Sequence, residues 1–128
     1  MKDQRIYLRH IAEAISDIED YTESGKEAFL GSRMQQDAVI RKLEVIGETA
    51  KHMSASLKDC KPGIPWREIS RMSDKLAHEY LGVNLETVWV LVERDLPLLR
   101  KAVEELLELQ DDLLHFYGIE NKGPQLPG

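Results

Sequence analysis

The chain has 128 residues, of which 42% are hydrophobic and 31% charged, so it can form one domain around a single core. Its formal net charge of −6 argues against a protein that coats nucleic acid non-specifically. This charge does not exclude an RNA enzyme whose positive charge is confined to one groove. No apolar run approaches the ~18 residues of a membrane span, the N-terminus lacks a signal-peptide core, and the lone Cys60 cannot form an internal disulfide. We therefore expect a cytoplasmic protein without a membrane segment.

Hydrophobic spacing predicts helices in the first half of the chain. Residues 3–21 repeat apolar side chains at steps of three and four, and Gly25 and Gly31 then interrupt that repeat, which predicts a loop. Ser32 is a suitable cap for a second helix, in which the same spacing runs to Met53.

The second half continues in the same way after a polar break over 58–63. Pro65 suits the first turn of a third helix, which we expect to end near Gly82. Asn84 can cap a fourth helix, and Pro97 either kinks that helix or begins a fifth.

The whole pattern predicts an all-α, antiparallel bundle of four to five helices over residues 1–117. Residues 118–128, rich in glycine and proline, are expected to form a flexible C-terminal tail. Trp66 and Trp89 fall on apolar faces and are expected to anchor the core.

Several other chemistries have weak support. His10, His52 and His115 lie on different predicted helices, without a pair at metal-ligand spacing. The sequence has no Gly-rich phosphate loop, no serine nucleophile elbow and no cysteine pair. We therefore expect neither a metal nor a cofactor.

The segment from Arg71 to Tyr80 concentrates chemistry-bearing side chains on one predicted helix. Arg71 and His78 are seven residues apart, so an ideal helix brings them within about 20° of each other, and Asp74 lies one turn before His78. RNA is cleaved without a metal when its 2′-hydroxyl attacks the adjacent phosphate, which needs a proton-exchanging group and a cation for the phosphate oxygens. Histidine and arginine supply these two functions, and Asp74 could orient the imidazole. Spacing alone leaves a second interpretation equally open, in which Arg71 forms a surface ion pair and His78 caps or packs.

Five stretches of the chain carry a family resemblance: Arg41-Lys-Leu-Glu-Val-Ile-Gly-Glu48, Pro65-Trp66-Arg-Glu-Ile69, Asp74-Lys-Leu-Ala-His78-Glu-Tyr80-Leu-Gly-Val83, Val88-Trp89 and Asp95-Leu96-Pro97. In this order and register they closely resemble the HepT-like branch of the HEPN superfamily, and the likeness extends from about Tyr7 to Tyr117. Such a string of separate matches is far more specific than a lone arginine and histidine.

The resemblance implies a HEPN helical bundle that dimerises and places two copies of the motif around a shared cleft. It also implies a metal-independent endoribonuclease that cleaves tRNA or mRNA, the toxin of a type VII toxin–antitoxin system. The catalytic residues would be Arg71 and His78, supported by Asp74 and Tyr80. The implied partner is a minimal nucleotidyltransferase (MNT) antitoxin, which forms a hetero-oligomer with the toxin and transfers AMP to the motif tyrosine, by position Tyr80.

One position departs from the family pattern. HepT-like members usually have arginine immediately before the aspartate of the motif, and this chain has Ser73 there. Either Arg71 has taken over the phosphate-binding role, or the loss of arginine at position 73 has reduced the activity. An ideal helix favours Arg71, because a spacing of five residues places position 73 about 140° from His78.

Two other classes of function stay open. The chain could be a non-catalytic nucleotide- or substrate-binding subunit of a two-component nucleotidyltransferase, with Arg71 and His78 contacting phosphate. Alternatively, it could be an interaction scaffold whose apolar helices pair with a partner. Ser73 gives the binding subunit some support, whereas the presence of His78 and Tyr80 counts against the scaffold.

Overall fold

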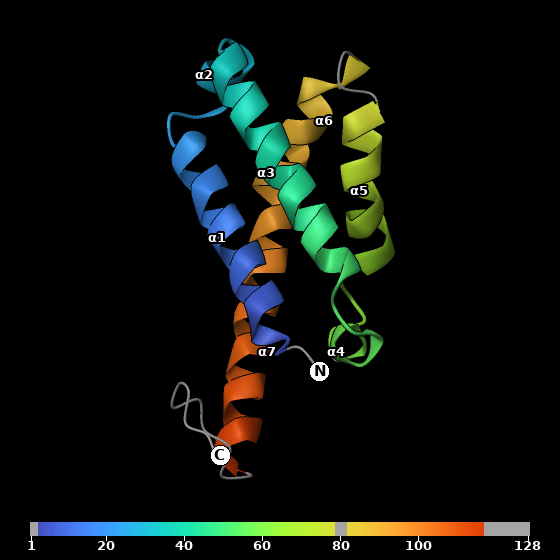
Figure 1. Cartoon of the computed structure of the whole chain (residues 1–128). Helices are drawn as coiled ribbons and strands as arrows, with labels where there is room; N and C mark the ends of the chain where they lie inside the picture. Colours follow the sequence, from blue (N-terminus) through green and yellow to red (C-terminus); the bar gives the residue numbers. More distant parts are fainter. Residues whose placement is uncertain (1–2, 79–81, 117–128) are drawn as a thin grey trace.

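A computed structural model describes residues 3–78 and 82–116, with side chains as far as Leu113. Every regular element in these ranges is helical, which confirms the all-α antiparallel bundle (Figure 1). The elements are α1 (Arg5–Tyr21), α2 (Lys26–Leu30), α3 (Arg33–Lys51), α4 (Ala55–Asp59), α5 (Trp66–His78), α6 (Leu85–Val90), the π-helical turn η2 (Leu91–Asp95) and α7 (Leu96–Phe116).

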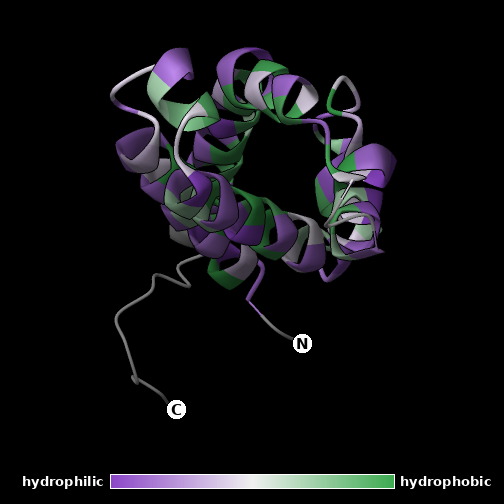
Figure 2. Cartoon of the chain, turned by 90° about the horizontal axis from the view of Figure 1, so that it is seen from above, coloured by the Kyte–Doolittle hydropathy of each residue, from purple (hydrophilic) through white to green (hydrophobic). Residues whose placement is uncertain are grey.

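Helix α3 is the centre of the bundle. Helices α1 and α5 pack against α3 from opposite sides, and α7 packs along α1 (Figure 1). Seen from above, hydrophobic and hydrophilic residues occupy different sides of the helices, as expected for amphipathic helices around one core (Figure 2). The core is formed by fully buried aliphatic side chains, among them Leu8, Ile11, Ile15, Ile18, Val39, Leu43, Ile46, Val103 and Leu106.

Polar side chains cap the helices where the sequence predicts caps. The Ser32 hydroxyl accepts a hydrogen bond from the Gln35 backbone N–H at 3.2 Å, and the Asn84 side-chain oxygen accepts one from Thr87 at 3.1 Å. Each bond satisfies a backbone donor that the first turn of a helix leaves free. The caps thereby fix where α3 and α6 begin.

Two short helices were not predicted. Residues of α2 and part of α4 lie in segments that the glycine and proline pattern assigned to loops. Each is five residues long, too short to show a hydrophobic repeat, but each contributes a buried side chain, Phe29 from α2 and Leu57 from α4. Gly25 precedes α2 with a φ of 95°, a backbone conformation that glycine adopts without a steric penalty.

The helical backbone continues without a loop from Leu85 to Phe116. The π-helical turn Leu91–Asp95 lies directly before Pro97, which has no N–H to donate to the preceding turn. Pro97 therefore accompanies an irregular turn inside one continuous helical segment, the first of the two predicted alternatives.

Both tryptophans belong to the core, as predicted, and each is only 8% exposed. The Trp66 indole N–H donates to the backbone oxygens of Lys58 and Lys61 at 3.1 and 3.0 Å, which ties the start of α5 to the α4 segment. Trp89 packs against Phe29, with ring centroids 5.5 Å apart.

Three regions of the predicted pattern lie outside the described residues: the segment 79–81, the tail over 118–128 and the expected end of the last helix at Tyr117. Helix α5 is described to His78, four residues short of the predicted end near Gly82. Among the helices that the structure describes, none combines the length and the apolar character needed to cross a bilayer.

Candidate active site

Helix α5 has a buried side and an exposed side of opposite chemistry. Its buried side chains are Trp66, Ser73 and Leu76. Its exposed side carries the charged and titratable residues Arg67, Glu68, Arg71, Asp74, Lys75 and His78. The sequence motif therefore lies on the exposed side of α5.

The buried side of α5 meets α3 at two small residues, Gly47 and Ser73. A Cβ atom added at Gly47 would lie 2.8 Å from the Ile69 backbone oxygen and 2.9 Å from the Ser73 nitrogen, closer than side chains tolerate. Only glycine at position 47 allows this approach of the two backbones. Ser73 itself is 3% exposed, on the side of α5 opposite to His78. The structure therefore agrees with the ideal-helix geometry at position 73.

Four polar side chains form a chain of bonds across the α3–α5 boundary. The Ser73 hydroxyl donates to Glu48 Oε2 at 3.0 Å, and Lys51 Nζ contacts the same carboxylate oxygen at 3.0 Å. Lys51 Nζ also donates to Asp74 Oδ1 at 2.9 Å. These bonds lower the pKa of Glu48, chiefly through Lys51 and secondly through Ser73, and the bonds to Asp74 and Glu48 raise the pKa of Lys51. The network attaches the turn before His78 to α3.

His78 is the last residue of α5 and is exposed. Its Nδ1 lies 2.7 Å from the backbone oxygen of Asp74, one turn earlier. A carbonyl oxygen can only accept a hydrogen bond, so Nδ1 carries the proton. In the neutral ring, Nε2 is then the free base. Asp74 thus holds the imidazole through its main chain, whereas its carboxylate is bonded to Lys51.

Arg71 and Lys75 are free cations on the same side of α5. Within the described part of the chain, neither has a carboxylate in ion-pair range, in contrast to Lys51, Lys61 and Arg100. Lys75 lies one turn after Arg71 and about one turn before His78. The helix therefore places a positive charge between the predicted arginine and the predicted histidine.

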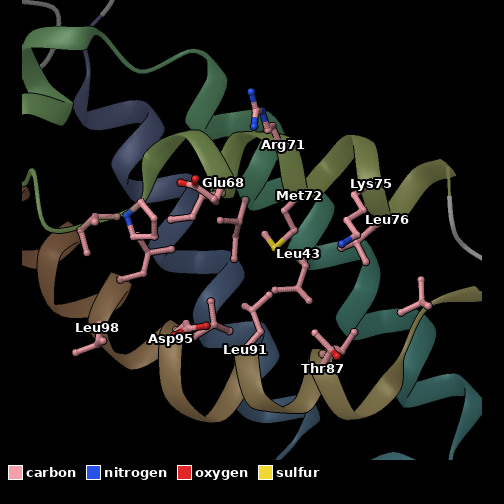
Figure 3. A pocket seen from close by; sticks show the side chains of 18 of the residues that line it. Leu43, Glu68, Arg71, Met72, Lys75, Leu76, Thr87, Leu91, Asp95 and Leu98 are labelled. Atoms are coloured by element: carbon pink, nitrogen blue, oxygen red, sulfur yellow. The ribbon is translucent and has the colours of Figure 1, made fainter.

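A mostly apolar cavity of about 600 Å³ lies between α5, α3 and the α6–α7 segment. Met72 and Leu76 of α5 point into it and Leu91 and Leu98 border it from the other side, whereas Arg71 points away from it (Figure 3). Arg71 and Lys75 are nevertheless both among the residues that line the cavity, whereas His78 is not. The exposed motif and the cavity therefore meet at Arg71 and Lys75.

The sequence also singles out Tyr80, His10 and His52. Tyr80 lies outside the described residues, so its role stays a prediction. His10 and His52 are exposed and apart from the motif, and His52 stacks on Tyr7 with ring centroids 5.9 Å apart. In the described residues, no three histidine, cysteine or carboxylate side chains are grouped in a way that could hold a metal ion.

Comparison with known proteins assigns the chain to a family. A profile of the ribonuclease HepT-like family matches residues 11–106. The chain belongs to the ribonuclease HepT-like family. It is 45% identical over 106 residues to the "Probable ribonuclease HepT" of Thermococcus cleftensis, an alignment that covers 82% of this chain and 96% of that protein. The resemblance to the HepT-like branch of the HEPN superfamily is thereby confirmed.

A second relative is longer. The chain is 42% identical over 113 residues to the "Gamma-glutamylcyclotransferase and putative RNase" of Methanocaldococcus jannaschii, which covers 88% of this chain and 50% of that protein. The chain thus spans half the length of this relative. No solved structure matches the chain at a significant level.

The HepT-like motif on α5 depends on residues of α3 that the prediction did not include among the site residues. Gly47, Glu48 and Lys51 contact α5 or its side chains from α3. Gly47 and Glu48 do belong to one of the stretches that carry the resemblance, and this was the available signal. Lys51 gave none, because its partner Asp74 is 23 residues away and only the packing of α3 on α5 brings them together.

Proposed function

We propose that this HepT-like chain is a metal-independent endoribonuclease acting on cytoplasmic RNA, tRNA or mRNA. The observation that supports this most strongly is the exposed side of α5, where His78 has a defined tautomer and Arg71 and Lys75 have no carboxylate partner among the residues that the structure describes. Phosphodiester cleavage by the 2′-hydroxyl requires a group that exchanges protons and a cation that stabilises the phosphate oxygens, and an imidazole beside cations supplies both.

In the proposed reaction, the 2′-oxygen attacks the adjacent phosphorus while His78 Nε2 accepts the hydroxyl proton. The bond between phosphorus and the 5′-oxygen breaks, and that oxygen leaves as a hydroxyl after it receives a proton from water, while His78 later returns its own proton to water. The products are a 2′,3′-cyclic phosphate and a 5′-hydroxyl end. Arg71 holds the phosphate oxygens, on which negative charge increases in the transition state.

We assign the phosphate-binding role to Arg71 and not to position 73. Ser73 is buried against α3 and bonded to Glu48, whereas Arg71 shares the exposed side of α5 with His78. On this assignment Arg71→Gln removes most of the activity. If Ser73→Arg instead raised the activity strongly while Arg71→Gln left it unchanged, the lost arginine at position 73 would be the correct explanation.

We further propose that the active unit is a homodimer in which the α5 helices of two copies line one cleft. The −6 net charge of a single chain makes it a weak binder of RNA, and two copies of the α5 cations concentrate positive potential in one place. The apolar cavity beside α5, with Leu98 63% exposed at its border, offers hydrophobic surface that a second copy can cover.

We also propose that the chain is the toxin of a type VII toxin–antitoxin system, with an MNT nucleotidyltransferase as antitoxin and partner in a hetero-oligomer. Transfer of AMP to the Tyr80 hydroxyl adds a phosphate two residues from His78, where it repels RNA and occupies the cations. Mass spectrometry after incubation with the antitoxin and ATP is expected to find AMP on the wild type and none on Tyr80→Phe. An AMP mass increment that persists in Tyr80→Phe places the modification on another residue.

The alternative is a non-catalytic nucleotide- or substrate-binding subunit of a two-component nucleotidyltransferase, which Ser73 favours. Incubation of purified protein with tRNA in EDTA separates the two functions. The ribonuclease produces fragments with 2′,3′-cyclic phosphate ends, and the binding subunit leaves the RNA intact although it retains it in a binding assay. Intact RNA at high enzyme concentration contradicts the ribonuclease proposal.

A further inference from the structure

The exposed side of α5 carries two cations more than the single arginine that the HepT-like motif requires. Arg67, Arg71 and Lys75 follow one another at steps of four residues, which rotates each by about 40° from the last and advances it by about 6 Å. All three are exposed. They therefore form a line of charge along the helix that leads towards His78, and we call it the α5 cation line.

In the described part of the chain, some cations are paired with carboxylates and others, such as Arg9 and Lys101, are not. The unpaired cations of the α5 cation line differ from these in following one another at regular steps along one helix. Lys26, Lys42, Lys61 and Arg100 each contact a carboxylate of another element. Among the described residues, Arg67, Arg71 and Lys75 have no carboxylate within ion-pair range. Unpaired cations keep their full charge for a ligand that approaches from solution.

Two carboxylates, Glu68 and Asp74, lie on α5 near this line and reduce its charge without reversing it. Asp74 shares Lys51 with Glu48, so its negative charge is only partly compensated from the α3 side. Glu68, Arg71 and Lys75 all line the cavity, although the Arg71 side chain points away from it (Figure 3). Against these two carboxylates the exposed side of α5 carries the three cations Arg67, Arg71 and Lys75, and it therefore stays positive.

We propose that the α5 cation line binds successive phosphates of one RNA strand, with Arg67 as a substrate-binding residue about two turns before the proposed catalytic pair. A spacing of about 6 Å between cations is close to the distance between neighbouring phosphates of an extended strand. Each copy offers one such line, which fits one backbone, and attack by the 2′-hydroxyl in line with the leaving oxygen needs a strand freed from the rigid A-form duplex. The inference rests on the proposed function for the identity of the ligand.

The test measures binding without cleavage. A labelled single strand of about 12 nucleotides, 2′-O-methylated throughout so that it cannot be cut, is titrated in EDTA between about 50 and about 200 mM KCl. The wild type is compared with Arg67→Gln, with the charge-conserving Arg67→Lys and with Arg9→Gln. Arg9 is a matched control because it is an exposed arginine on α1, on the opposite side of α3 from α5.

Each phosphate contact contributes about 0.7 to the slope of log affinity against log salt for a single strand. Arg67→Gln is therefore expected to weaken binding and reduce the slope by about 0.7, whereas Arg67→Lys and Arg9→Gln keep the wild-type slope. A circular dichroism melt establishes that each variant is folded.

The outcomes separate this inference from the proposed function. An Arg67→Gln slope equal to that of the wild type overturns the inference and leaves the ribonuclease proposal standing. A reduced slope in a protein that never cleaves unmodified RNA supports the cation line and overturns the ribonuclease. Tighter binding to a duplex of the same sequence overturns the assignment to a single strand.

Discussion

At the scale of single residues, Gly47 controls how close α5 comes to α3. The chain places its smallest side chain opposite the backbone of α5, and the buried Ser73 completes the contact. A larger side chain at position 47 would push away the helix that carries Arg71 and His78. A residue without a functional group thus determines where the HepT-like motif of α5 lies.

Gly47→Ala is expected to lower the free energy of unfolding by about 1–3 kcal/mol, because the new methyl group meets backbone atoms that cannot rotate aside. Urea denaturation of both proteins measures the difference. Gly63→Ala is the control, since a Cβ atom there meets nothing within 4 Å. Equal stability of Gly47→Ala and the wild type would show that the helices are not in close contact at this position.

The sequence predicted part of the site at this scale. Arg71 and His78 share the exposed side of α5, and Ser73 is buried, as the helical angles require. The bond from Asp74 to Lys51 was not predictable, because it depends on the angle at which two helices cross. Asp74 was expected to orient the imidazole of His78, and in the structure its backbone oxygen contacts that ring while its carboxylate is bonded to Lys51.

At the scale of elements, α5 is attached to α3 by apolar packing and by the bonds among Glu48, Ser73, Lys51 and Asp74. The lowered pKa of Glu48 means that its ionised form is favoured in the folded chain, first by Lys51 and then by Ser73. This contribution to stability is fully present above the unfolded-state pKa of about 4.3. It is lost as the pH falls through the lower pKa of the folded state.

Glu48→Gln removes this titration. We expect the wild type to be more stable than Glu48→Gln at neutral pH, with a difference that shrinks as acid protonates the carboxylate, at a pH below the ordinary pKa of glutamate because the folded-state pKa is lowered. Urea midpoints of the two proteins at neutral and at acidic pH provide the comparison. A difference that stays constant from neutral to acidic pH would mean that the bonds of Glu48 do not stabilise the α3–α5 contact.

Long helices were predictable and short ones were not. The spacing of apolar residues gave α1, α3, α5 and the segment from Leu85 onward, because each long helix presents several turns of the repeat. Helices α2 and α4 are too short for a repeat and owe their form to single buried side chains and to caps such as Ser54. The π-helical turn before Pro97 also had no pattern of its own in the sequence.

At the scale of the whole molecule, the cavity beside α5 and the exposed motif next to it point to an assembly of two copies. We expect light scattering at micromolar concentration to give about twice the chain mass of 14.7 kDa. Leu98→Glu introduces a charge at the exposed border of the cavity and should shift this equilibrium towards the monomer. A wild type that stays at the single-chain mass contradicts the shared cleft.

We propose above that His78, on the exposed side of α5, cleaves RNA without a metal. The most direct measurement is the cleavage rate of tRNA in EDTA by the wild type, by His78→Ala and by His10→Ala. His10 is an exposed histidine on α1 and controls for the loss of an imidazole elsewhere. We predict that His78→Ala reduces the rate about 10²–10⁴-fold with unchanged helicity and oligomeric state, while His10→Ala cleaves at the wild-type rate. Full activity of His78→Ala would contradict the assignment of His78 as the residue that accepts the 2′-hydroxyl proton.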